Sequence, residues 1–173
     1  MARMIDLHLH SELSDDSRAP VEAYLKWLAR KRDERPLDGI VLTEHRQFDS
    51  HSDYRQLEDK YGMLILKASE VETEYGHVLV YGVNDDMLKR FDFSNVRLRA
   101  QELIDEVAGM GGVAMACHPG RPTIGLIEHY EHRPPLEGVV GVEALNGGSK
   151  KGENERVAEL IDSYGYHAFG GSD

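Results

Sequence analysis

Two histidines stand two residues apart in the apolar stretch near the start of the chain. His8 and His10 alternate there with leucines, and Asp6 precedes them in the same register. Side chains two residues apart in a β-strand point to the same face, so a strand would present all three together. Burying two imidazoles without a charged or metallic partner costs free energy. This spacing therefore indicates a metal site at the end of a first strand.

Similar side chains follow the later apolar runs of the sequence. They are His45 in LTEH, Glu70 in ASEV, His118 in ACHPG and Asp173 in GGSD. The carboxyl ends of the strands in a barrel open on one mouth, so we expect these groups to converge there. Imidazoles and carboxylates without a thiolate suit divalent zinc, manganese or iron. A lone histidine at a strand end more often has only a packing role, and it is the joint pattern that favours a metal centre.

Two further residue types in this pattern need interpretation. Glu72 and Glu74 follow Glu70 at intervals of two residues and so share its strand face. The sequence therefore leaves open which of these carboxylates faces the site. Cys117 has no separate base placed for it, and we interpret it as a small buried hydrophobic residue rather than a nucleophile.

The elements that must position these groups alternate along the chain, as in an α/β protein. Seven strands are predicted, over residues 4–9, 39–43, 63–71, 77–83, 113–117, 139–145 and 166–169. One helix opens at Pro20 and carries its apolar residues on one face: Val21, Tyr24, Leu25 and Leu28. A second is predicted over 96–109, and a third over 153–164 with Gly165 as its cap.

Composition narrows the class of protein. A length of 173 residues predicts one domain, and a single cysteine excludes an internal disulfide. The net charge of −11 disfavours binding to long nucleic acid, which needs a surface that neutralises phosphates. No apolar run approaches the roughly 18 residues of a membrane span. The first ten residues lack the apolar region of a signal peptide, so we expect a cytoplasmic protein.

Taken together, four motifs resemble those of the PHP (polymerase and histidinol phosphatase) domain across essentially the whole chain. They are DLHLHS followed by Ser14-Asp15, then Thr43-Glu44-His45, His118-Pro119 and Gly171-Ser172-Asp173. The resemblance implies one domain over 1–173, folded as a distorted seven-stranded (β/α)7 TIM-like barrel. It also implies two or three bound divalent metal ions.

Carried over position by position, the resemblance implies a role for each ligand-type residue. One metal would be held by His8, His10 and Asp173, and a second by His77 and His118, with Glu70 bridging the two. A third would use Asp15 and His45, with a histidine that the family has two residues after its last aspartate. The sequence stops at Asp173, so we expect a truncated chain without the family's closing C-terminal helix. Glu44 replaces the family's usual Asp, which should affect only contacts around the ligands.

The chemistry that such metals support is hydrolysis of a phosphate ester by a hydroxide that bridges two of them. We expect His45 or a metal-bound water to protonate the leaving group. Arg121 would bind the phosphate and Asn146 would line the pocket, with a surface salt bridge and a structural role as their respective alternatives. A small phosphomonoester, such as histidinol phosphate or a nucleotide, fits the acidic chain best. The alternatives are a phosphodiesterase or exonuclease acting on nucleic-acid ends, for which a basic stripe is missing, and a non-catalytic metal-stabilised scaffold.

Overall fold

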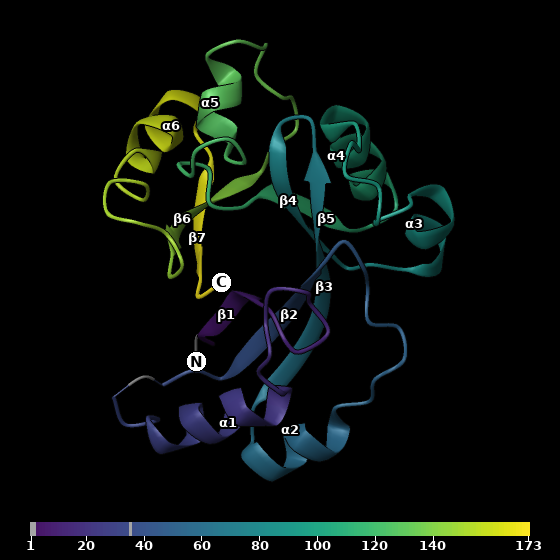
Figure 1. Cartoon of the computed structure of the whole chain (residues 1–173), viewed down its shortest axis with the longest axis vertical. Helices are drawn as coiled ribbons and strands as arrows, with labels where there is room; N and C mark the ends of the chain where they lie inside the picture. The colour runs from purple at the N-terminus through teal and green to yellow at the C-terminus, as the bar shows by residue number, and fades with distance from the viewer. Residues whose placement is uncertain (1–2, 35) are drawn as a thin grey trace.

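Seven strands form one curved sheet in the computed structural model, which describes residues 3–34 and 36–173. The strands follow one another in sequence order around a nearly closed barrel (Figure 1). Their bounds are β1 Ile5–Leu9, β2 Gly39–His45, β3 Leu64–Thr73, β4 Gly76–Tyr81, β5 Val113–Ala116, β6 Gly141–Asn146 and β7 His167–Gly171. The predicted α/β class and the seven strands are confirmed.

Six helices of the described residues connect the strands on the outside of the sheet (Figure 1). They are α1 Val21–Arg30, α2 Arg55–Tyr61, α3 Asp85–Arg90, α4 Ala100–Gly109, α5 Leu126–Tyr130 and α6 Val157–Tyr164. Helix α1 buries Val21, Leu25 and Leu28 in an apolar cluster with residues of β1, β2 and β3, as its spacing predicts. None of the described helices is long and apolar enough to cross a membrane.

Two predicted helices begin later in the structure, and three further helices were not predicted. Helix α4 begins only at Ala100, because Leu98 pairs with Thr73 as a β-bridge and the Glu74 carboxylate accepts from the Ala100 amide at 2.8 Å. Helix α6 likewise begins at Val157, after a series of turns. The short helices α2, α3 and α5 were not predicted. They are five to seven residues long, too short to show a helical apolar period.

Strand direction decides which ends of the strands meet. β1, β2 and β3 are parallel to one another, β4 is antiparallel to both β3 and β5, and β5, β6 and β7 are again parallel. The carboxyl ends of the six parallel strands therefore open on one mouth of the barrel, together with the amino end of β4. This places His77, the second residue of β4, on the same mouth as the residues that follow the other strands.

The two edges of the sheet, β7 and β1, come together at the gap in the barrel (Figure 1). The amides of Ser172 and Asp173 both donate to the His8 carbonyl, at 3.1 and 2.8 Å. Gly171 makes this approach possible, since a Cβ added to it would lie 2.2 Å from the Cβ of His8. A side chain at position 171 would therefore push β7 away from β1 and move Asp173.

Gly171→Ala is accordingly expected to lower the free energy of unfolding by about 1–3 kcal/mol, the usual cost of overpacking. In a chain of this size that corresponds to a fall in the melting temperature of roughly 2–12 °C. Thermal unfolding followed by circular dichroism measures it. Gly109→Ala is the matched control, because it lies in α4 with nothing within 4 Å of the added Cβ. It should leave stability unchanged or raise it, and an equal loss in both variants would contradict the close-approach argument.

Candidate metal centre

Glu70 lies at the centre of a buried cluster of imidazoles at the carboxyl-end mouth of the barrel. Its side chain is 1% exposed. The Oε2 atom is 2.9 Å from His8 Nε2 and 3.1 Å from His10 Nε2. The Oε1 atom is 2.6 Å from His77 Nδ1 and 3.0 Å from His118 Nε2. One carboxylate thus contacts two imidazoles with each of its oxygens.

The two other glutamates of this strand face are engaged elsewhere. Glu72 accepts from Arg46 at 2.8 Å, and Glu74 accepts from the first amide of α4. The choice that the sequence leaves open is therefore resolved by position: Glu70 alone of the three reaches the histidines.

Four side chains form the largest group of potential ligands among the described residues: His8, His10, Glu70 and Asp173. His8 Nε2 and His10 Nε2 are 3.1 Å apart, and Asp173 Oδ1 is 3.1 Å from His10 and 3.4 Å from His8. Bonds of about 2.0–2.1 Å to a tetrahedral zinc ion place its ligands roughly 3.4 Å from one another. The donor atoms of this group are thus already spaced almost as such an ion requires.

His45 lies at the edge of the same cluster, with 13% of its side chain exposed. Its ring stacks on His10 with centroids 4.2 Å apart, and its Nε2 is 3.1 Å from Asp16 Oδ2. The Nδ1 atom is buried without a hydrogen-bond partner among the described residues, although Glu70 Oε2 lies 3.4 Å away. A buried nitrogen lone pair beside a carboxylate oxygen is what a divalent cation would satisfy.

Asp15, predicted to share a metal with His45, lies outside the cluster. Its side chain is 65% exposed and pairs with Arg46, while the next residue, Asp16, contacts His45. Asp16 rather than Asp15 joins the group of His10 and His45. Two consecutive aspartates in a loop offer the same chemistry, and only the loop conformation determines which one turns inward.

His77 and His118 both reach Glu70 Oε1, but they do not form one compact group as the resemblance implies. His77 groups with Glu70 and His45, whereas His118 groups with Glu70 and Cys117. The Cys117 sulfur is 3.4 Å from Glu70 Oε1. Cys117 is fully buried, as expected, but its thiol contacts the carboxylate at the centre of the cluster.

Arg121 and Asn146 were both predicted to contact substrate, and the structure places them around Asp173. Arg121 Nη2 donates to Asp173 Oδ2 at 2.6 Å and to Asn146 Oδ1 at 3.0 Å. Asn146 Nδ2 donates to the same aspartate oxygen at 3.0 Å. These contacts hold Oδ2, so Oδ1 is the oxygen that faces His8 and His10. Both residues thereby orient a potential ligand.

Two buried glutamates contact residues of the cluster, Glu143 directly and Glu44 through Ser14. No role was assigned to Glu143 from the sequence. Glu143 in β6 is fully buried and lies 3.1 Å from His8 Nδ1, and it accepts from the His118 amide at 2.8 Å. Its signal was a lone charge inside the apolar run GVEALN. Glu44 accepts from Ser14 Oγ at 2.6 Å, and that hydroxyl lies 3.3 Å from His10 Nδ1. Partners of this kind fix the orientation of metal-bound histidines.

Charge is strongly coupled across the cluster. Burial lowers the pKa of His8, but hydrogen bonds to Glu143 and Glu70 outweigh it and raise that pKa to about 10. Burial likewise opposes the contacts of His10 with Asp173 and Glu70, which raise its pKa to about 9. Burial alone would raise the pKa of Glu70 and of Asp173, yet the surrounding histidines keep both below their usual range. The neighbouring carboxylates thus favour the protonated form of these imidazoles when no metal is bound.

Metal binding is expected to release at least one proton per chain at pH 7.5, because a ligating imidazole nitrogen must be neutral. The release should shrink as the pH rises through about 9 to 10, where His10 and His8 have lost their protons unaided. Zinc titrations by calorimetry, in buffers of different ionisation enthalpy, measure the number released. A value that does not fall between pH 7.5 and pH 10.5 would contradict this account.

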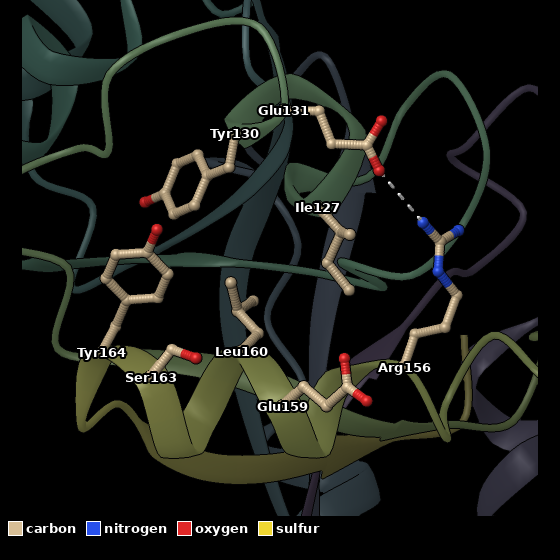
Figure 2. Close-up of a pocket in the computed structure, with 8 residues that line it drawn as sticks. All are labelled: Ile127, Tyr130, Glu131, Arg156, Glu159, Leu160, Ser163 and Tyr164. Carbon is tan, nitrogen blue, oxygen red and sulfur yellow. Dashed lines mark ion pairs between the residues drawn. The ribbon is translucent and has the colours of Figure 1, made fainter.

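A cavity of about 440 Å³ opens beside the cluster. Its lining includes His10 and Asp173 from the cluster, and Asp16, Arg18 and Tyr24 from the segment that follows β1. A separate hollow of about 230 Å³ lies between α5 and α6, with Tyr130, Leu160 and Tyr164 in its wall and Glu131 3.9 Å from Arg156 (Figure 2). None of the described potential ligand groups belongs to that second hollow.

No protein-family model matches the chain. A curated relative, the uncharacterized protein MJ1587 of Methanocaldococcus jannaschii, is 26% identical over 163 residues, which are 88% of this chain and 87% of that protein. This relative is described without an activity, and its sequence identity to this chain is too low to assign a family. The resemblance to PHP domains thus stays at the level of motifs.

Solved structures share the fold. A protein of Bifidobacterium adolescentis described as a "putative metal-dependent phosphoesterase" matches with a TM-score of 0.65 and 16% identity, over all of this chain and 88% of its own. An amidohydrolase of Chromobacterium violaceum, solved with sulfate and no metal, matches with a TM-score of 0.69 and 18% identity. The match covers 98% of this chain and 86% of that protein. PsfC of Pseudomonas syringae matches with a TM-score of 0.66 and 20% identity, and the match covers 99% of this chain and 75% of that protein.

Proposed function

We propose that this chain is a metal-dependent phosphoesterase that hydrolyses a small phosphomonoester of the histidinol phosphate or nucleotide type. The observation that carries the proposal is the arrangement around Glu70, whose two oxygens each contact two imidazoles inside a barrel mouth. The fold shared with the protein described as a "putative metal-dependent phosphoesterase" supports it. So does the cavity beside the cluster, which has room for a small substrate.

The donor set fits two or three divalent ions, with zinc, manganese or iron as the candidates. His8, His10 and Asp173 would hold one, and Glu70 would link it to a second ion held from the side of His77 and His118. His45 and Asp16 would hold the third. When bound, such ions supply a water molecule of lowered pKa and neutralise charge on the phosphoryl oxygens.

Residues around the potential ligands would orient them. Glu143 can accept from Nδ1 of His8, and Nε2, which faces Glu70 and His10, would then be the nitrogen that binds a metal ion. Arg121 and Asn146 occupy the outer oxygen of Asp173 and keep the inner one facing the histidines. When it does not hold a third ion, His45, which is 13% exposed and stacked on His10, is our candidate for the group that protonates the leaving alcohol.

We assign to Arg18 the role of binding the negatively charged phosphate of the substrate. It is exposed, it lines the cavity beside His10 and Asp173, and no ion pair with another described residue engages it. Arg121, by contrast, is already paired with Asp173. A free guanidinium can bind two oxygens of one phosphate at once.

Arg18→Ala is therefore expected to reduce kcat/KM for a phosphomonoester by roughly tenfold to a hundredfold, since a hydrogen bond to a charged group contributes about 1.5–3 kcal/mol. Bound metal should be unchanged, as measured by elemental analysis. Arg97→Ala, an exposed arginine away from this cavity, is the control and should retain full activity. Equal activity in the Arg18 variant and the wild type would remove Arg18 from the substrate site.

The test of the function is a substrate screen on metal-loaded protein. We expect turnover of p-nitrophenyl phosphate and of at least one natural phosphomonoester, loss of turnover with a chelator, and recovery on return of zinc or manganese. Faster turnover of bis-p-nitrophenyl phosphate would support the phosphodiesterase alternative. Full metal loading without hydrolysis of any ester would support the non-catalytic scaffold and overturn the proposal.

A further inference from the structure

We propose that Cys117 is a metal ligand, and that its thiolate joins Glu70 and His118 in binding the cation on the Oε1 side of the cluster. The inference rests on the proposed metal centre and adds to it a donor of a different chemical class. It makes this side of the centre a mixed sulfur, nitrogen and oxygen site.

The three donor atoms already lie together. Cys117 Sγ is 3.4 Å and His118 Nε2 is 3.0 Å from the same oxygen of Glu70. One ligand atom from each of these residues lies within 4.8 Å of the others, and all three residues are buried. His118 is 2% exposed, and Nε2 is the only one of its ring nitrogens with a hydrogen-bond partner among the described residues. Its imidazole is therefore held in place through the cluster.

The backbone after β5 presents two consecutive side chains to one carboxylate. Neighbouring residues of a regular strand point to opposite faces, so they would not normally share a contact. Strand β5 ends at Ala116, and His118 has a φ of 31°, in the left-handed region that residues other than glycine rarely adopt. This turn brings both the thiol and the imidazole to Glu70 Oε1.

A simple packing role accounts poorly for Cys117. It is fully buried, but it is not surrounded by apolar groups alone. Its sulfur instead contacts an ionised carboxylate. An alanine would fill an apolar position there without placing a thiol beside that charge.

A thiolate ligand changes which metals the centre prefers. Sulfur donors favour zinc and other softer ions over manganese and magnesium, which prefer oxygen. On binding, the S–H bond would break, the sulfur would keep the electron pair that it gives to the cation, and the proton would leave to solvent. The prediction is therefore a zinc-preferring site rather than one that takes whichever ion is available.

Cobalt(II) substitution tests the proposal by spectroscopy and without turnover. Metal-free protein, kept reduced with a phosphine rather than a thiol, is titrated with Co²⁺ while absorbance and bound cobalt are recorded. The chain has one cysteine, so a thiolate-to-cobalt charge-transfer band in the near ultraviolet can come only from Cys117. We expect this band in the wild type, and its complete loss in Cys117→Ser and Cys117→Ala while the visible cobalt bands of the other ligands persist.

The outcomes separate this inference from the function on which it rests. Stoichiometric cobalt binding without the charge-transfer band would overturn the Cys117 assignment and leave the metal centre intact. Failure to bind cobalt at all would overturn both. The wild-type spectrum decides the question even if the alanine variant does not fold, and the nearly isosteric serine variant then provides the comparison.

Discussion

Glu70→Gln is expected to abolish turnover and to empty the metal centre. Loss of a residue that only supports a ligand typically reduces metal affinity or activity by about 10–100-fold, so loss of a group that contacts four imidazoles should exceed the upper figure. The neutral amide also offers one acceptor atom where the carboxylate offers two, and each of those two receives a pair of histidines. The His8–His10 side and the His77–His118 side of the cluster should therefore both lose their metal.

Elemental analysis after dialysis, together with kcat/KM for p-nitrophenyl phosphate, measures this effect. Glu72→Gln is the matched control, because it lies two residues along β3 and pairs with Arg46 outside the cluster. It should retain metal and activity. Metal retention by the Glu70 variant at the wild-type level, with its circular dichroism unchanged, would show that this carboxylate is not the link between the two sides.

Apolar periodicity was sufficient to predict most of the barrel. Each of the seven strands is a short run of apolar residues bounded by turn residues, and each lies within a few residues of its predicted position. The paired placement of His8 and His10 followed from the two-residue repeat of a strand alone. The position of His77 needed one further fact, the reversed direction of β4, which a sequence pattern does not reveal.

The sequence could not predict which way side chains point in loops, or which residues pair with buried charges. Asp15 and Asp16 are chemically identical, and the choice between them depends on how the loop after β1 turns toward Arg46 or His45. Arg121 appeared free to bind phosphate because its partner, Asp173, lies 52 residues away in the chain. Contacts of this range are properties of the closed barrel.

Glu143 shows most clearly what that closure adds, because one carboxylate from β6 supports residues of two other segments. It is fully buried, lies within hydrogen-bond distance of His8 Nδ1, and accepts from the His118 amide and from Asn146 Nδ2. A buried acceptor with three donors cannot be removed without leaving those donors unsatisfied. Its loss should therefore disturb both sides of the metal centre, although it does not face the cavity.

Glu143→Gln is expected to weaken zinc binding by about 10–100-fold, the range for partners that orient metal-bound histidines. The His118 amide and Asn146 Nδ2 both donate to Glu143 Oε2, so the amide oxygen can keep these two contacts only by turning its NH2 group toward His8 Nδ1. Competition with a chromophoric chelator measures the zinc affinity, and chemical denaturation of the metal-free protein measures stability separately. Glu159→Gln, an exposed glutamate of α6, is the control and should match the wild type in both. Unchanged zinc affinity in the Glu143 variant would mean that the orientation of His8 is set by the ligands themselves, and that the buried carboxylate serves the fold alone.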